Sequence, residues 1–529
     1  MSIAAFLPLL PIFILILTAT SIVGLRFVRP GFKYFWLLAA VGTLLAWPLV
    51  LLSRNYLGQS ISFSTWLPAE YFPVSPQILV DAYSWPFAFA LSTLVLATIL
   101  TDIARATESD WASWASNLFL TALGILAVQA GNPLTLLLMW TLIDLTEVLI
   151  LLGGIQNSAG RERVVIGFST RVAGIFFLIG AQLYIYSTGL TPDFQKFPPQ
   201  ASLLFLISAI LHLRAIPSNR LLPQPSPLGR NRGNISNLVT AAASFILIVR
   251  TALVGVPENL EPFLLLFCGI VGIFATLAWN NTGAGFAGME FWILGMVTLT
   301  LAAAVRGQPG AALAWGIAAL LPGGLLLLTS VRLRFLPIIL FLGLIGISTF
   351  PYTPAWQGAY LYSSPFEPAL ILLLFVQSLF LVGYARFAIQ TEPREGGIER
   401  WVWIIYPWGL ALLPLAQFII EFFDLPEGIS LANAWPSIVV IVCAGVLYTL
   451  GNRSIKNSFL SEISHRMGSA ISIIFSFEWL FRLLWRSYTV IGQGMTYFVR
   501  VIEGDGGILW ALLFLVLLVT IITQIRIGI

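Results

Sequence analysis

The sequence predicts an all-α protein that crosses a membrane many times, and three observations lead to this fold class. Hydrophobic residues make up 58% of the 529 residues, and charged residues only 9%. Apolar stretches of about 20 residues, the length that spans a bilayer as a helix, follow one another along nearly the whole chain. Most of the basic residues lie in the short segments between these stretches. One large helical membrane domain therefore explains the composition better than several soluble domains would.

About sixteen apolar spans can be counted along the chain, with boundaries good to about three residues. The first span has no basic leader and no small-residue cleavage site, so we expect it to be retained as a membrane helix. We expect the spans to begin near residues 4, 33, 82, 113, 133, 163, 200, 235, 262, 285, 310, 334, 366, 402, 434 and 508.

The loops alternate in their content of Lys and Arg, which are enriched in short loops on the cytoplasmic side. The opposite loops hold few basic residues and several carboxylates. The alternation predicts a multi-pass protein with both termini outside, and the expected location is the plasma membrane of a bacterium. The basic loops contain Arg26, Arg29, Lys33, Arg105, Arg161, Arg163, Arg214, Arg220, Arg230, Arg232, Arg332, Arg334, Arg386, Arg394, Arg400, Arg453 and Lys456.

The segment from Ile455 to Gly507, before the last span, has a different composition. Aromatic side chains alternate with arginines between Phe475 and Arg500. This pattern is typical of an amphipathic helix lying in the membrane interface, with rings at headgroup depth and guanidinium groups reaching outward. We expect such a helix on the cytoplasmic face, in contact either with lipid or with another subunit.

Two carboxylates, Asp144 and Glu147, lie inside the apolar run that starts near Pro133. At 1.5 Å per residue Asp144 is about 16 Å along this helix, near the middle of the hydrocarbon core. A charge at that depth is costly and normally faces the protein interior, where it is paired or carries ions. The two carboxylates share one helix face, and Arg171 in the next span lies at a comparable depth. A static Asp144–Arg171 ion pair and a proton relay both remain open.

Prolines interrupt two of the expected spans, the seventh and the twelfth. The seventh contains His212 and is followed by Pro217, and the twelfth contains Pro351 and Pro354. Two interrupted helices five spans apart indicate an internal duplication. Broken helices at corresponding places are typical of a transport site, because the freed backbone groups must line a cavity. For the seventh span, a simple helix end is the alternative.

Four stretches of the sequence carry a resemblance to one known family: VDAYSWPFAFALSTLVLATIL from Val80, NPLTLLLMW ending at Trp140, TRVAGIFFLIGA from Thr170 and ISTFPYTPAWQG from Ile347. They resemble landmarks of the antiporter-like membrane subunits of respiratory complex I, of membrane-bound hydrogenases and of multisubunit sodium/proton antiporters. The resemblance covers roughly residues 75 to 390. The number of spans and the aromatic segment before the last helix are most similar to the largest of these subunits.

The resemblance implies two inverted five-helix repeats, about 113–256 and 262–390, each with a broken helix. It also implies a polar axis of Lys, Glu and His along the membrane centre, and partners in a multisubunit complex. The expected organisation is N-terminal helices (1–75), an antiporter-like core (76–390), two further spans (391–450), the interfacial segment (451–507) and a last transmembrane helix (508–529).

Most charged residues of that axis are replaced in this chain. The family's intramembrane Glu corresponds to Thr141, its first Lys to Leu206, Ile207 or Ser208, its His to the run from Thr240 to Ser244, and its second Lys to Gln357 or a neighbour. Only Arg171 remains of the family's Asn-Arg-x-Gly-Asp motif. The chain has three lysines, Lys33, Lys196 and Lys456, all outside the expected spans. A lysine relay is therefore excluded, and arginine does not replace it because a guanidinium keeps its proton.

The remaining candidates for an ion path are Asp144, Glu147, Arg171, His212, Glu290 and Gln357, and we expect Asp144, Glu147, His212 and Glu290 to be buried. Two hypotheses follow. Either the subunit conducts protons or sodium by a rerouted path, with a carboxylate one turn from Thr141 acting for the missing one, or it is a non-conducting structural subunit that keeps the fold. An independent secondary transporter is a third, weaker alternative.

The sequence offers no catalytic site of its own, because it contains no nucleotide-binding loop, no metal-ligand cluster and no nucleophile with a base. The two cysteines, Cys268 and Cys443, both fall in apolar segments, so neither a metal site nor a disulfide framework is predicted. We expect no cofactor and no metal. Basic residues form no continuous patch, so no nucleic acid is expected. The expected partners are the lipid bilayer and other membrane subunits.

Overall fold

The computed structural model describes most of the chain. The described residues are 7–63, 74–105, 110–154, 158–213, 232–282, 288–330, 335–363, 365–389, 402–424, 434–454, 486–487, 489–490, 492–494, 496 and 512–518.

The chain divides into two compact units, Met1–Gly468 and Ser469–Ile529. In the second unit, residues 512–518 are helical and apolar. Most of the expected interfacial segment, 455–507, lies outside the described residues. The first unit contains fifteen of the described α-helices, α1 to α15, and one short hairpin.

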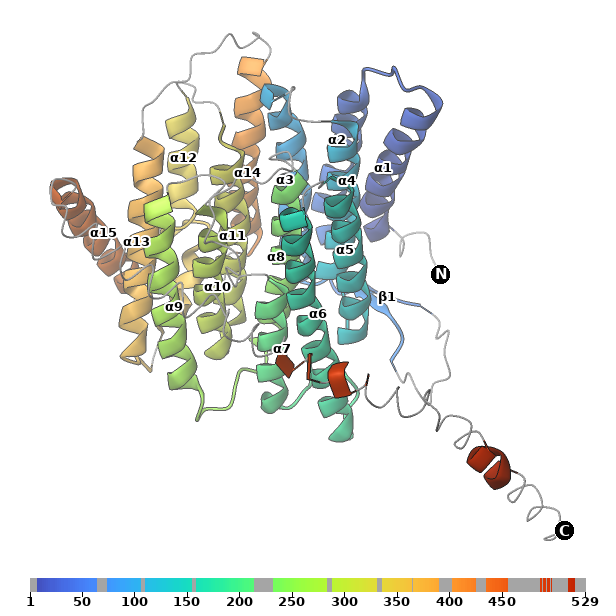
Figure 1. Cartoon of the computed structure of the whole chain (residues 1–529). Coiled ribbons are helices and arrows are strands. Elements are labelled where there is room, and N and C mark those ends of the chain that lie inside the picture. The colour runs from blue at the N-terminus through green and yellow to red at the C-terminus, as the bar shows by residue number, and fades with distance from the viewer. Residues whose placement is uncertain are drawn as a thin grey trace. The chain divides into compact units, whose positions relative to one another are not determined.

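The first seven of these helices end by His212, and the hairpin lies between α2 and α3 along the chain (Figure 1). Their bounds are α1 (Leu10–Val28), α2 (Phe35–Leu52), α3 (Ser84–Thr101), α4 (Trp111–Val128), α5 (Pro133–Gly154), α6 (Ser158–Ser187) and α7 (Pro199–His212), and the hairpin pairs β1 (Ser60–Ser62) with β2 (Gln77–Leu79).

The remaining eight helices follow in the same unit, with a 3-10 helix, η5 (Trp356–Tyr362), between α12 and α13. Their bounds are α8 (Arg232–Thr251), α9 (Glu261–Thr282), α10 (Met289–Val305), α11 (Pro309–Leu328), α12 (Leu336–Ile345), α13 (Ala369–Ile389), α14 (Val402–Asp424) and α15 (Trp435–Ser454).

The predicted fold class is confirmed, since the chain is an all-α polytopic membrane protein. Among the described residues, 10 helices are long and apolar enough to span a membrane, and the shorter α7, α8, α10, α12 and α15 are apolar too. Each of α1 to α15 corresponds to one expected span. The largest discrepancy among the later helices is α6, which begins at Ser158 instead of near 163, because its polar first turns lie beyond the apolar run. The total of sixteen and the inverted repeats stay predictions.

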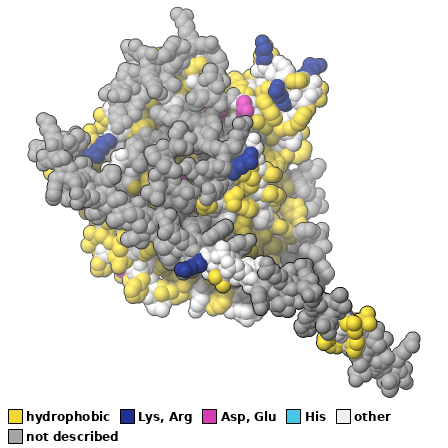
Figure 2. Space-filling model, in the orientation of Figure 1, with side chains coloured by type: hydrophobic (Ala, Val, Ile, Leu, Met, Phe, Trp, Pro, Cys, Tyr) yellow, Lys and Arg dark blue, Asp and Glu magenta, His cyan; other side chains and the backbone are white. Residues whose placement is uncertain are grey.

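Apolar side chains both fill the interior of the first unit and cover its outside. Helices α3 and α11 are almost wholly buried, and α8 packs against α3, α4, α7, α10 and α11. Large apolar side chains such as Phe176 and Phe263 are exposed, and hydrophobic side chains cover much of the described surface on one face (Figure 2). An apolar surface of this kind is matched to lipid or to other membrane subunits.

The hairpin between α2 and α3 is a feature that the sequence did not predict. Its second strand also pairs with the turn before α5, where the Leu79 amide donates to the Gln129 carbonyl and the Gly131 amide donates to the Gln77 carbonyl. Asn132 begins α5 by accepting from the Thr135 amide at 2.9 Å, as a cap side chain does. The start of α5, and therefore the depth of its carboxylates, is fixed by these contacts.

Candidate functional site

Helices α5, α6, α7 and α8 meet around a group of buried polar side chains. The closest packing is between α6 and α7, at Gly174. A Cβ atom there would lie 2.9 Å from the Ser208 carbonyl oxygen and 3.0 Å from the His212 amide nitrogen. Only glycine leaves room for this approach, which brings the end of α7 against the middle of α6. The Ser208 hydroxyl completes the contact by donating to the Gly174 carbonyl at 2.7 Å.

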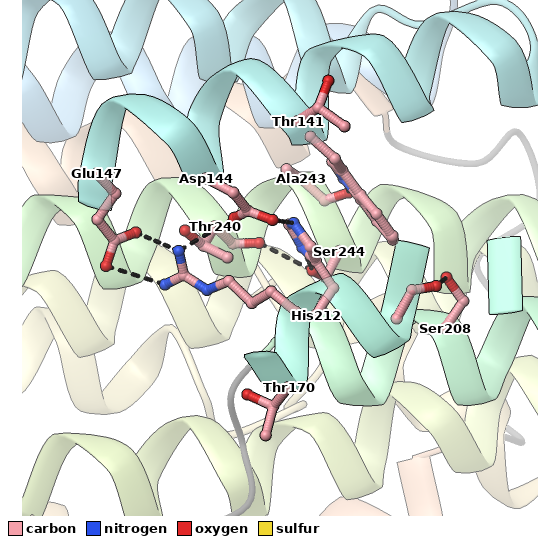
Figure 3. Close-up of polar contacts among 12 residues, drawn as sticks. Thr141, Asp144, Glu147, Thr170, Ser208, His212, Thr240, Ala243 and Ser244 are labelled. Atoms are coloured by element: carbon pink, nitrogen blue, oxygen red, sulfur yellow. Dashed lines mark hydrogen bonds and ion pairs between the residues drawn. The ribbon is translucent and has the colours of Figure 1, made fainter. Parts of the chain in front are cut away.

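Arg171 of α6 binds both carboxylates of α5 (Figure 3). Its Nη1 donates to Asp144 Oδ1 at 3.1 Å and also to Glu147 Oε2, and its Nη2 donates to Glu147 Oε1 at 3.0 Å. The three residues are at most 3% exposed. The predicted Asp144–Arg171 pair is therefore present, and Glu147 joins it because residues three apart on a helix share a face.

His212, the last residue of α7, extends this cluster on the other side of Asp144. Its Nε2 lies 3.4 Å from Asp144 Oδ2, and its Nδ1 lies 2.8 Å from Ser244 Oγ on α8. The imidazole stacks on the indole of Trp140, with ring centroids 3.8 Å apart and planes 6° from parallel. Trp140 is held in turn by donating to the Ala243 carbonyl at 3.2 Å. His212 is wholly buried, so its orientation is fixed on every side by α5 and α8.

The charges of these four side chains, Asp144, Glu147, Arg171 and His212, do not balance unless a proton is added. Two ionised carboxylates and one guanidinium leave a net charge of −1, and a neutral imidazole does not change it. A net charge is costly in a low-dielectric interior. The cluster is therefore a place where one proton binds favourably, and imidazole and carboxylate are the two groups here that exchange protons readily.

Further buried polar side chains lie on α8 toward its N-terminus. Ser236, Thr240 and Ser244 are spaced by four residues and so share one face. The hydroxyl oxygens of Ser236 and Thr240 have no hydrogen-bond partner among the described residues, and neither has the amide of the buried Asn117 on α4. Buried polar groups of this kind are places for ordered water.

The second interrupted helix has a different character, because its polar side chains are uncharged. Helix α12 ends at Ile345, and residues 346–355 contain two non-glycine residues with left-handed backbone, Thr349 (φ 52°) and Tyr352 (φ 65°). Tyr362 donates to Gln377 Oε1 at 3.0 Å, and Gln377 Nε2 donates to Thr349 Oγ1 at 2.7 Å. Thr349 also contacts Ser437 on α15 at 3.2 Å. Neutral hydrogen bonds hold this strained segment in place.

The structure places the other candidate residues outside the charged cluster. Gln357 is half-buried in η5 and lines a cavity of about 10 Å³ together with Pro354. Pro351 lies in the segment between α12 and η5. Pro217 is outside the described residues. Within the described part of the chain, no group of three or more His, Cys, Asp or Glu side chains is arranged to hold a metal ion.

The expectation that Glu290 is buried is wrong, because its side chain is exposed. The apolar run suggested a helix beginning near 285, which would place Glu290 well inside it. Helix α10 begins at Met289, so Glu290 lies in its first turn. A carboxylate is favourable there, since the N-terminal end of a helix carries partial positive charge.

Sequence reasoning missed the parts of the site that depend on tertiary contacts. These are the stacking of Trp140 on His212 and the hydroxyl of Ser244 at the imidazole. The four-residue spacing of Ser236, Thr240 and Ser244 was the one sequence signal for a polar face on α8. The sequence pattern also did not predict that the buried Arg250 of α8 pairs with Asp81 at the start of α3.

No protein-family model and no curated protein matches this sequence. Several solved structures are similar to it. A chain of the Mrp complex from Dietzia sp. has a TM-score of 0.68 at 14% identity, over 98% of this chain and 63% of that one. This chain thus spans less than two thirds of the length of that neighbour.

Two further chains are matched over nearly their whole length. A chain of the membrane-bound sulfane sulfur reductase, an archaeal respiratory membrane complex, has a TM-score of 0.62 at 14% identity, over 97% of this chain and 99% of that one. A chain of respiratory complex I from Thermus thermophilus has a TM-score of 0.59 at 15% identity, over 84% and 99%. At such low identity these likenesses show the fold.

Proposed function

We propose that this chain, which has the fold of the antiporter-like membrane subunits, is a membrane subunit of a multisubunit ion-translocating complex and that its buried cluster binds and releases one proton. The observation that carries the proposal is the composition of the cluster. The cluster buries four side chains together, Asp144, Glu147, Arg171 and His212, and their net charge is −1 when the imidazole is neutral. The three similar chains all belong to complexes, which supports a role beside other membrane subunits.

Within the cluster the four groups have different roles. Arg171 keeps its proton at any physiological pH and so supplies a fixed charge. Glu147 shares two hydrogen bonds with it and is its main counter-ion. Asp144 lies between Arg171 and His212 and faces them with different oxygens, so a proton on the imidazole gives Asp144 a second cation to pair with.

The chain has no lysine to take over this task. Lys33 and Lys196 are exposed in loops, and Lys456 lies outside the described residues. Relay chemistry in the membrane therefore depends on the imidazole and the carboxylates.

A second candidate function, a non-conducting structural subunit, is favoured by the second half of the chain. Between residues 261 and 389 there is no Asp, Lys or His, and the carboxylates are Glu261, Glu290 and Glu367. None of these three is buried. The interrupted helix in this half is held by neutral side chains, and the buried carboxylate beside it, Glu421, comes from α14 outside this range.

The test begins with a tagged chain purified gently from its native membrane, together with the subunits that accompany it. Proton flux is then measured in liposomes for the natural chain and for Asp144→Asn. The matched control is Asp193→Asn in the loop between α6 and α7. We expect assembly to be unchanged in both variants and flux to fall at least about tenfold in Asp144→Asn alone, as for loss of an acid–base group. Normal flux in an assembled Asp144→Asn complex would support the structural subunit instead.

A further inference from the structure

The Ser244 hydroxyl determines which nitrogen of His212 carries hydrogen. A hydroxyl has one hydrogen to donate, and Ser244 donates it to the Thr240 carbonyl oxygen at 3.0 Å. A carbonyl oxygen has no hydrogen to give in return. The 2.8 Å contact between Ser244 Oγ and His212 Nδ1 is then a hydrogen bond only if Nδ1 is the donor.

With Nδ1 protonated, a neutral imidazole would present a lone pair at Nε2. This lone pair would face Asp144 Oδ2 at 3.4 Å. Neither atom has a hydrogen-bond partner elsewhere among the described residues. Two buried acceptors facing each other repel and remain unsatisfied, which is unfavourable in a closed interior. A proton between His212 Nε2 and Asp144 Oδ2 removes both problems.

The charge of the cluster leads to the same conclusion independently. Without an added proton the four buried side chains carry −1, and with it they carry zero, whether the proton is written on the imidazole or on the carboxylate. The face of the Trp140 indole also favours a cationic ring stacked on it, because the π face of an indole attracts positive charge. The titratable or charged groups facing His212 are Asp144, Glu147 and Arg171.

We propose that Ser244 is a positioning residue that holds His212 in its Nδ1–H form, so that the resting site already contains one proton, shared between His212 Nε2 and Asp144 Oδ2. The inference rests on the proposed function only for the use made of that proton. Since Nδ1–H is fixed against a hydroxyl whose own hydrogen is bound to a carbonyl, the proton that exchanges is the one at Nε2. Proton transfer therefore takes place on the Asp144 side of the ring.

The experiment uses the fact that the chain contains only two histidines, His212 and His465. In a His465→Gln chain, labelling with 15N-histidine reports on His212 alone. Solid-state NMR of the assembled complex in lipid near neutral pH distinguishes the imidazolium, the neutral Nδ1–H form and the neutral Nε2–H form. We expect either the imidazolium, or the Nδ1–H form together with the infrared carbonyl band of a protonated Asp144 that disappears in Asp144→Asn. The neutral Nε2–H form, or Nδ1–H without that band, would overturn the proposal.

Two substitutions at Ser244 test its role. Ser244→Ala removes the acceptor at Nδ1, and we expect the ratio of protonated to unprotonated site to fall at least about tenfold at the same pH, because a hydrogen bond from a charged donor is lost. Ser244→Thr keeps the hydroxyl and should retain the natural spectrum. An unchanged spectrum in a folded Ser244→Ala chain would show that Ser244 does not set the state of the ring.

Failure of this inference is distinguishable from failure of the proposed function. A resting proton at His212 combined with normal flux in Asp144→Asn would leave the inference standing and remove the transport function. A neutral Nε2–H ring combined with flux that depends on Asp144 would do the reverse.

Discussion

Arg171 binds Asp144 and Glu147 at the same time, with Nη1 3.1 Å from Asp144 Oδ1 and Nη2 3.0 Å from Glu147 Oε1. The guanidinium of α6 carries one positive charge, so it neutralises only one of the two negative charges on this face of α5. The remaining negative charge is what links this pair of helices to His212 at the end of α7. A static ion pair needs only one carboxylate, and in the proposed function the second carboxylate is what makes the site respond to a proton.

Replacing Arg171 by Gln should destabilise the protein strongly. The change leaves two buried carboxylates without their fixed counter-charge, and breaking a buried ion pair from one side costs about 3–5 kcal/mol. The double variant Arg171→Gln/Glu147→Gln removes one charge of each sign and should recover much of this loss. Thermal unfolding is followed by the reaction of Cys268, which is buried in α9, with a thiol dye in a Cys443→Ser background. Equal thermal stability of the single variant and the natural chain would show that the ion pair contributes little.

Substitution of Gly174 by Ala should force α6 and α7 apart. The added methyl group would lie 2.9 Å from the Ser208 carbonyl oxygen, which is backbone and does not move aside. We expect a loss of about 1–3 kcal/mol in stability, the usual cost of overpacking, and a longer distance between His212 and Asp144. The matched control is Gly180→Ala on the same helix, where a Cβ would meet nothing within 4 Å. The two variants are compared by the same unfolding assay, and equal stability of both would contradict the proposed close approach.

Properties that depend on local sequence were predicted well. The apolar runs located α1 to α15, and the position of Asp144 along its helix was enough to predict its pairing with Arg171, because depth in a membrane is nearly a function of position in the span. The prediction that Glu290 is buried was wrong because it depended on where α10 begins. The helix begins later than the apolar run indicated, so Glu290 lies in its first turn and not in its interior. Boundaries are the least certain part of any such prediction.

The details that give the cluster its chemistry could not be read from the sequence. His212 contacts Trp140 and Ser244, which are 72 and 32 residues away along the chain, and nothing in the local pattern of either residue specifies this. The family resemblance indicates only that Ser244 ends the run where the family has a histidine, and it says nothing about the close helix approach at Gly174. Tertiary packing of α7 between α6 and α8 determines these contacts.

Replacing Gln377 by Leu tests whether the second interrupted helix contributes structure only. Gln377 is buried and bridges Tyr362 and Thr349, so its loss leaves the Tyr362 hydroxyl buried and unsatisfied, at a cost of about 1–3 kcal/mol. Adding Tyr362→Phe removes that hydroxyl and should restore part of the stability. Because neither side chain exchanges protons at neutral pH, we expect proton flux per assembled complex to stay within about twofold of the natural value in both variants, in contrast to Asp144→Asn. A large loss of flux in a stably assembled Gln377→Leu complex would show that a proton path runs through the second half of the chain.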